Sequence, residues 1–247
     1  MRLSRLVGGL AIALPLFLGT FSLFSWILPN YDPVFHDTIS HFYYNDALAE
    51  EVFVGTLVGL GLIMITYRGG NSTESRVASA GGVLAICVAM FPTSGWIELE
   101  GSYDRCSNPT EPPPGSWDAW VGVIHVGSAV LLFALLAYFC LVLFRRPGPS
   151  GAINSKNKEK RNRYYWRSGL TIVGCMLAIA GYWLVGDDAK CSEARLWSDL
   201  NLTFVFEAIA LIAFGFSWLV RSRGMGKWLL DKDQAAWLGH MESPAAK

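Results

Sequence analysis

The sequence predicts an all-α, polytopic membrane protein with six transmembrane helices and with its N- and C-termini in the cytoplasm. Three observations carry this prediction: 52% of the residues are hydrophobic and only 16% are charged, six apolar stretches alternate with polar loops, and the basic residues are sorted by side. About a quarter of the residues in a soluble chain are charged. No loop is long enough for a second folded domain, so residues 1–247 are predicted to form a single membrane domain.

The basic residues set the predicted orientation. If Met1 lies in the cytoplasm, every Lys and Arg except Arg105, Lys190 and Arg195 falls on the cytoplasmic side. An excess of basic residues in short cytoplasmic loops is typical of membrane proteins. We therefore expect the chain in a cell membrane, and the short loops favour a bacterial inner membrane. Membrane lipids are the expected partners. The net charge of zero argues against a nucleic-acid partner, which requires a basic face.

The first helix is predicted over residues 7–28, which is about the length that crosses a bilayer. Arg2 and Arg5 before this apolar stretch also fit a signal peptide. The stretch is longer than the usual signal core, and no clear small-x-small cleavage site follows it. We therefore interpret it as a retained transmembrane helix.

The other five helices are predicted over residues 47–67, 77–92, 119–144, 168–185 and 202–220. Glu50 and Glu51 suit the positive end of the second helix dipole, and Gly69–Gly70 interrupt the chain after it. Between the third and fourth helices, residues 93–118 contain four prolines and are predicted to be irregular. Between the fourth and fifth, the basic stretch 146–167 is predicted to be a cytoplasmic loop.

The five cysteines divide by location. Cys87, Cys140 and Cys175 lie inside predicted helices, where a lone cysteine is usually a small apolar packing residue. Cys106 and Cys191 are the two in outer loops, where an oxidising compartment would let them pair. The sequence predicts a Cys106–Cys191 disulfide. Two free thiols are the alternative, because spacing does not establish the geometry that a disulfide requires.

Glu207 lies in the apolar sixth helix, and such a residue needs a partner. A carboxylate at a helix centre costs about 2.5–3.5 kcal/mol on membrane-insertion scales. His125 lies at a similar depth in the fourth helix, with Gly122 and Ser128 on the same helical face. We expect a contact between His125 and Glu207. A structural clamp and a functional pair that carries a proton or binds a ligand are both consistent with it.

The first outer loop adds further titratable residues to the same side. Asp37 and His41 are four residues apart, so in a helix they would share one face. An amphipathic stretch lying on the membrane surface is the alternative interpretation. Glu51 forms a line with Gly55 and Gly59 along the second helix. The sequence thus predicts an outward-facing polar pocket formed by Asp37, Ser40, His41, Glu51, His125 and Glu207.

Metal binding is a further hypothesis for this side of the membrane. Three histidines with a carboxylate can form a zinc site that keeps one open position, and His36, His41 and His125 all lie on the outer half. The sequence contains no H-E-x-x-H motif and no cysteine-rich spacing. Zinc is therefore an alternative that rests on residue types alone.

Several short motifs occur in order along the chain: Ile39–Tyr44, Val52–Gly55, Ala89–Thr93, His125 and Phe206–Ala208. In this order the chain resembles small bacterial six-helix membrane proteins of a family of unknown function. That family is itself similar to the DRAM and FRAG-type eukaryotic membrane proteins. The resemblance implies an α-helical membrane bundle and a link to membrane lipids, and it implies no established reaction.

Three functions fit these observations. The first is a non-enzymatic protein whose outward-facing pocket binds a lipid headgroup or a small solute. The second is a membrane-embedded hydrolase, zinc-dependent or not, that uses His36, Asp37, Ser40, His41 and His125. The third is a proton-coupled transporter or channel subunit that uses His125 and Glu207. The inner halves of the fourth and sixth helices are nearly all apolar, which counts against the third. The first requires the least, and whether the protein is an enzyme stays open.

Overall fold

The computed structural model describes residues 2–25, 38–44, 48–93, 119–146, 156–184, 197 and 200–222. This part of the chain consists mainly of long α-helices, with two further short helical segments. The long helices are α1 (Arg2–Ser25), α2 (Leu48–Thr66), α3 (Ser72–Met90), α4 (Ala119–Tyr138), α5 (Lys156–Leu184) and α8 (Leu202–Arg221). The short segments are the 3₁₀ helix η1 (Ile39–Tyr44) and the π-helical turn η2 (Phe139–Leu143), which continues α4.

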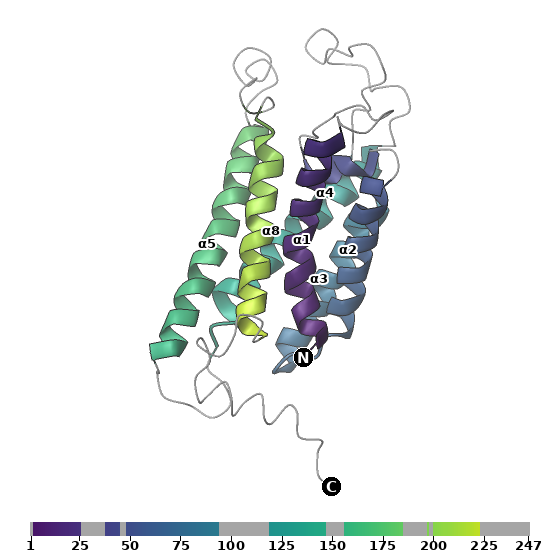
Figure 1. Ribbon diagram of the computed structural model, residues 1–247. Helices are drawn as coiled ribbons and strands as arrows, with labels where there is room; N and C mark the ends of the chain where they lie inside the picture. Colours follow the sequence, from purple (N-terminus) through teal and green to yellow (C-terminus); the bar gives the residue numbers. More distant parts are fainter. Residues whose placement is uncertain are drawn as a thin grey trace, which may run out of the picture.

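The long helices form a closed ring that follows their order in the sequence. Each helix packs against the next one, and α8 closes the ring by packing against α1 (Figure 1). The first residues of α1 and α5 and the last residues of α2 and α8 lie at one end of the bundle, which we call the Glu74 end. The segment η1 and the first residues of α4 and α8 lie at the opposite end, which we call the Ser40 end.

Five of these helices are long and apolar enough to cross a membrane, as in a multi-pass membrane protein. The stretches that qualify are Arg5–Leu23, Leu48–Thr66, Trp120–Leu143, Lys158–Leu184 and Leu202–Arg221. The predicted third span is not among them, because α3 begins with a polar turn that contains Glu74 and Arg76. In the ring, α3 packs between α2 and α4, as a further membrane-crossing helix would. The sixth span stays a prediction.

Glycines let two pairs of helices approach each other closely. A Cβ atom on Gly61 of α2 would lie 2.7 Å from the carbonyl oxygen of Gly82 on α3. Gly8 of α1 and Gly215 of α8 are related in the same way. A Cβ atom on either glycine would lie 2.7 Å from the carbonyl oxygen of the other. Close backbone contact through small residues is how helices commonly associate inside a membrane.

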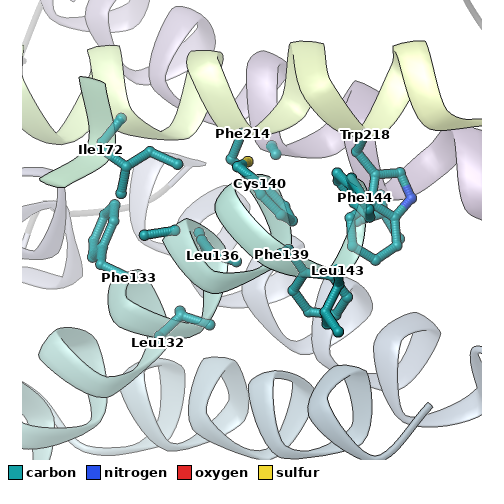
Figure 2. Close-up of a cluster of buried hydrophobic side chains, with 14 of the residues drawn as sticks. Leu132, Phe133, Leu136, Phe139, Cys140, Leu143, Phe144, Ile172, Phe214 and Trp218 are labelled. Atoms are coloured by element: carbon teal, nitrogen blue, oxygen red, sulfur yellow. The ribbon is translucent and has the colours of Figure 1, made fainter. Parts of the chain in front are cut away.

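The π-helical turn η2 packs aromatic residues between α4 and α8. The N–H of Phe144 donates to the carbonyl oxygen of Phe139 over 2.9 Å, which is the wide i to i+5 turn of a π-helix. The rings of Phe139 and Phe144 lie 5.2 and 5.4 Å from the ring of Trp218 (Figure 2). On α5, a Cβ atom at Gly169 would overlap the side chain of Leu141. This cluster joins three helices toward the Glu74 end.

Three predicted helix starts were wrong. The first helix begins at Arg2 and not at Val7. The fifth helix begins at Lys156 and not at Ser168, so much of the predicted basic loop is helical. Lys, Arg and Glu are good helix formers, which a search for apolar residues alone does not register. The third helix begins at Ser72 and not at Val77. Asn71 caps it, because its side chain accepts a hydrogen bond from the N–H of Glu74 over 2.9 Å.

Several sequence predictions fall outside the described residues. The predicted Cys106–Cys191 disulfide is one of them, and the candidate site residues His36 and Asp37 are others. The three cysteines inside described helices, Cys87, Cys140 and Cys175, are free, and the last two are buried. The disulfide therefore stays a prediction.

Candidate functional site

The polar residues at the Ser40 end meet at η1. This segment turns tightly, because the N–H of His41 donates to the side-chain oxygen of Thr38 over 3.1 Å. Its apolar residues Ile39 and Phe42 are buried in a cluster with residues of α1, α2, α3 and α8. The ring of Phe42 lies 6.0 Å from that of Phe204 on α8. The apolar side of η1 is thus packed against the bundle, which fixes the position of Ser40.

His125 connects η1 to the end of α3. It lies on the packed face of α4, and only 2% of its surface is exposed. Its Nδ1 is 2.6 Å from the carbonyl oxygen of Phe91, and its Nε2 is 2.9 Å from the hydroxyl oxygen of Ser40. A carbonyl oxygen only accepts, so Nδ1 carries the proton. In the neutral ring Nε2 then accepts, and the Ser40 hydroxyl donates to it.

The end of α3 explains why the Phe91 carbonyl is available. The last carbonyls of a helix have no N–H partner within that helix. Phe91 has an extended backbone (φ −104, ψ 113) and precedes Pro92, and a residue before proline disfavours helical geometry. The α3 helix therefore ends at Met90, and the Phe91 carbonyl orients the imidazole ring of His125.

Glu207 holds the residue next to Ser40. It lies on the same face of α8 as the buried residues Thr203, Ala210 and Phe214. Its Oε2 accepts a hydrogen bond from the backbone N–H of Ile39 over 2.7 Å. The first N–H groups of a helical segment lack partners within the segment, and Glu207 supplies one for η1. Side chains of α4 and α8 thus hold consecutive residues of η1.

The expected direct contact between His125 and Glu207 is not present among the described hydrogen bonds and ion pairs. Each side chain instead has its own partner in η1, Ser40 for His125 and Ile39 for Glu207. The physical reason is that a short segment between α1 and α2 supplies a donor to each helix. The two residues belong to one site, although the contact between them is indirect.

Two other predicted pocket residues have different surroundings. His41 follows Ser40 in η1 and is partly exposed. Glu51 is exposed and lies opposite the buried face of α2, which carries Ala49 and Phe53. A Cβ atom at Gly55 or Gly59, on the line that starts at Glu51, would have nothing within 4 Å. No described contact joins Glu51 to Ser40 or His125, and its place in a shared pocket stays a prediction.

The described residues also give no support to the predicted zinc ligands. Among them, no three His, Cys, Asp or Glu side chains gather closely enough to hold a metal ion. Both ring nitrogens of His125 have hydrogen-bond partners, so neither is available to a metal in this arrangement. What this site offers chemically is a serine hydroxyl next to an oriented imidazole.

A second polar cluster, at the Glu74 end, was missing from the sequence predictions. Only 1% of the surface of Glu74 is exposed. Its carboxylate accepts from the hydroxyl of Tyr67 over 2.9 Å and from the N–H of Gly70 over 3.1 Å, and it pairs with Arg221 over 3.5 Å. We call these four residues the Glu74 network. The Asn71-x-x-Glu74 spacing is a helix-capping pattern that would have drawn attention to Glu74.

In the Glu74 network the carboxylate, the guanidinium and the tyrosine hydroxyl favour one another's charge states. Burial raises the pKa of the Tyr67 hydroxyl, and the nearby carboxylate of Glu74 raises it further. Tyr67 therefore stays protonated and donates a hydrogen bond to Glu74. The guanidinium of Arg221 also lies 5.9 Å from the ring centre of Phe144, a contact that favours a cation. The network thus ties the end of α2, the start of α3 and the end of α8 together.

Comparison with known proteins identifies no family. No family model, no curated protein and no solved structure matches the chain. The likeness to six-helix bacterial membrane proteins therefore stays a resemblance of short motifs. What is established is a helical protein with five long apolar helices.

Proposed function

We propose that the protein is a multi-pass membrane hydrolase in which Ser40 is the nucleophile and His125 is the general base. One observation carries the proposal: the Ser40 hydroxyl is 2.9 Å from Nε2 of a ring whose Nδ1 is fixed by a carbonyl oxygen 2.6 Å away. A nucleophile, a base within hydrogen-bond reach and a third group that orients the base are the general requirements of nucleophilic catalysis. Here the Phe91 carbonyl replaces the carboxylate of a serine-histidine-aspartate triad.

The reaction follows from these roles. As the Ser40 oxygen attacks the carbonyl carbon of an ester or amide, its proton passes to Nε2 of His125. The protonated ring then donates this proton to the leaving alcohol or amine. The bond between this group and the acyl carbon breaks, which leaves the acyl group on the Ser40 oxygen. Water, deprotonated by His125, releases the acid and restores the Ser40 hydroxyl. Glu207 is a positioning residue, because it holds the Ile39 amide and touches neither reacting atom.

The position of η1 supports a membrane-surface substrate. The segment lies at the end of the bundle at which α4 and α8 begin (Figure 1). Trp120, in the first turn of α4, is exposed, and exposed tryptophans are enriched at the headgroup level of membranes. Ser40 is partly exposed whereas His125 is buried, so a substrate would reach the hydroxyl first. We therefore propose an ester or amide bond near lipid headgroups as the substrate class.

Binding of a lipid headgroup or small solute without reaction is the second candidate. It is favoured by the way in which Glu207 and His125 each hold η1 through one polar contact. A ligand that offers an N–H or hydroxyl group could replace the Ile39 amide and the Ser40 hydroxyl. The two candidates differ in whether Ser40 reacts.

A fluorophosphonate probe tests whether Ser40 reacts without requiring knowledge of the substrate. An activated serine displaces fluoride from the phosphorus, and the probe stays attached through the serine oxygen. In the detergent-purified chain we expect the label on the peptide that contains Ser40. It should be lost in Ser40→Ala and kept in Ser128→Ala, which removes a buried hydroxyl from the same face of α4. An unlabelled Ser40 in the folded wild type would contradict the hydrolase and leave binding as the function.

We also propose that both termini face the cytoplasm of a cell whose membrane holds the protein. Among the described residues, every Lys and Arg lies toward the Glu74 end, and basic residues concentrate on the cytoplasmic side. The test places a cysteine at the exposed Thr73, after the native cysteines have been replaced by serine. A membrane-impermeant maleimide should label Thr73→Cys only after cell lysis, and labelling of intact cells would reverse the orientation.

A further inference from the structure

The first turns of α5 carry a basic face that the proposed hydrolase does not use. Lys160, Arg163, Tyr164 and Arg167 line a hollow of about 240 Å³. Their spacing of three, four and seven residues places them on one side of the helix. The hollow lies toward the Glu74 end of the bundle, opposite the Ser40 end (Figure 1).

The hollow combines a fixed tyrosine with exposed cations. The ring of Tyr164 packs against Phe216 of α8 at 5.7 Å, which holds one wall in place. Lys160, Arg163 and Arg167 are exposed. Glu159 is the acidic residue of α5, and it meets Arg163 over 3.4 Å with both side chains largely in solvent. An exposed ion pair of this kind contributes little free energy, so an incoming anion can displace Glu159.

The same side of α5 continues as an apolar stripe. After Arg167, steps of three and four residues lead through Leu170, Gly174, Leu177, Gly181 and Leu184. Leu177 is 67% exposed and Leu184 is 87% exposed. A Cβ atom at Gly174 or Gly181 would have nothing within 4 Å. Leucines thus alternate with glycine gaps along the part of α5 that is apolar enough to cross a membrane.

We propose that this face of α5 binds one anionic membrane lipid. Its phosphate would lie against Lys160, Arg163 and Arg167, and one acyl chain would lie along the stripe from Leu170 to Leu184. Exposed Trp166, beside the basic face, suits the level of the membrane surface. Basic clusters next to a transmembrane helix attract anionic lipids. A free phosphate ion would use the cations alone, whereas a lipid also uses the stripe that continues from them.

The first test uses the detergent-solubilised full chain and phosphatidylglycerol as the probe. We expect phosphatidylglycerol to raise the midpoint of thermal unfolding, and phosphatidylcholine with the same acyl chains and inorganic phosphate to leave it unchanged. The triple variant K160Q/R163Q/R167Q should bind phosphatidylglycerol on the order of tenfold to a hundredfold more weakly. The control R68Q/R145Q/R146Q removes three exposed cations at the same end and should bind like the wild type.

A second pair of variants tests the acyl-chain stripe without changing charge. Gly174→Phe combined with Gly181→Phe fills the gaps and should weaken binding of phosphatidylglycerol. Gly55→Phe combined with Gly59→Phe fills equally open positions on α2 and should leave binding unchanged. Equal loss in both charge variants or in both glycine variants would overturn the assigned site. Stabilisation by inorganic phosphate as strong as that by phosphatidylglycerol would overturn the lipid in favour of a free anion. The basic hollow lies at the end of the bundle opposite Ser40 (Figure 1), and no residue of this face of α5 belongs to the proposed active site, so neither result depends on the proposed hydrolase.

Discussion

The two ends of the helix ring each hold a carboxylate, and the two carboxylates have different surroundings. Glu74 is almost completely buried and has Tyr67, Gly70 and Arg221 as partners. Glu207 is partly buried and, within the described part of the chain, has one hydrogen-bond partner, the Ile39 amide. Next to Ile39, the partly exposed Ser40 hydroxyl meets an oriented imidazole. The Glu74 network connects helices, whereas the Ser40 end holds a reactive group in position.

The difference shows how a polar cluster that stabilises a fold can be told from one that can react. In the Glu74 network each bond closes a helix end or neutralises a charge, and the partners come from the turn after α2 and from α8. At the Ser40 end the polar side chains hold a short 3₁₀ segment and not a long helix. Removing Glu74 should therefore lower stability most, and removing Ser40 should lower it least.

Glu74→Leu is expected to have the largest effect on stability. It leaves Arg221 and the Tyr67 hydroxyl beside an apolar side chain, and breaking a buried ion pair typically costs about 3 kcal/mol or more. Glu74→Gln keeps an acceptor for Tyr67 and should cost less. The free energy of unfolding in mixed micelles measures both changes. If Glu74→Leu costs no more than Glu207→Leu, the Glu74 network does not have the structural role assigned to it.

Glu207→Leu should cost less, about 2 kcal/mol, because it leaves one backbone N–H without its acceptor. Glu207→Gln offers an amide oxygen at nearly the same place, and we expect a loss of about 0.5 kcal/mol or less. The same unfolding measurement compares the two variants. Equal and negligible losses would mean that Glu207 does not hold η1.

Ser40→Ala should have the smallest effect on stability, a loss of about 1 kcal/mol or less. The partly exposed position lets water reach Nε2 of His125, and the bond from Nδ1 to the Phe91 carbonyl remains. A loss as large as that of Glu74→Leu would show that Ser40 serves mainly to attach η1, and would favour a structural role for the pair.

The bounds of a helix could be predicted from the sequence where an apolar stretch begins and ends at polar residues. Helices α2 and α8 begin and end within about a residue of their predicted bounds, since each is an apolar stretch between polar residues. The start of α5 was wrong because Lys156–Arg167 is helical without being apolar. The start of α3 depends on the Asn71 cap, which lies outside the apolar stretch.

The candidate site was predicted in its residues and not in its contacts. Ser40, His125 and Glu207 stood out because polar groups in or beside apolar helices need partners. The hydrogen bonds of these side chains depend on how η1 packs against the bundle through Ile39 and Phe42. Spacing along the chain does not determine that packing. Glu74 was missed for a similar reason, because its partner Arg221 lies on a helix far along the chain.

The pairing of Ser40 with His125 is best tested by the rate at which the fluorophosphonate probe modifies Ser40 in His125→Gln and in Glu74→Gln, each corrected for the fraction of folded protein. His125→Gln should be modified about a hundredfold more slowly than the wild type, because it lacks the general base. Folded Glu74→Gln should react at the wild-type rate, because its change lies at the other end of the bundle. Wild-type reactivity of His125→Gln, or equal slowing in both variants, would show that His125 is not the general base for Ser40.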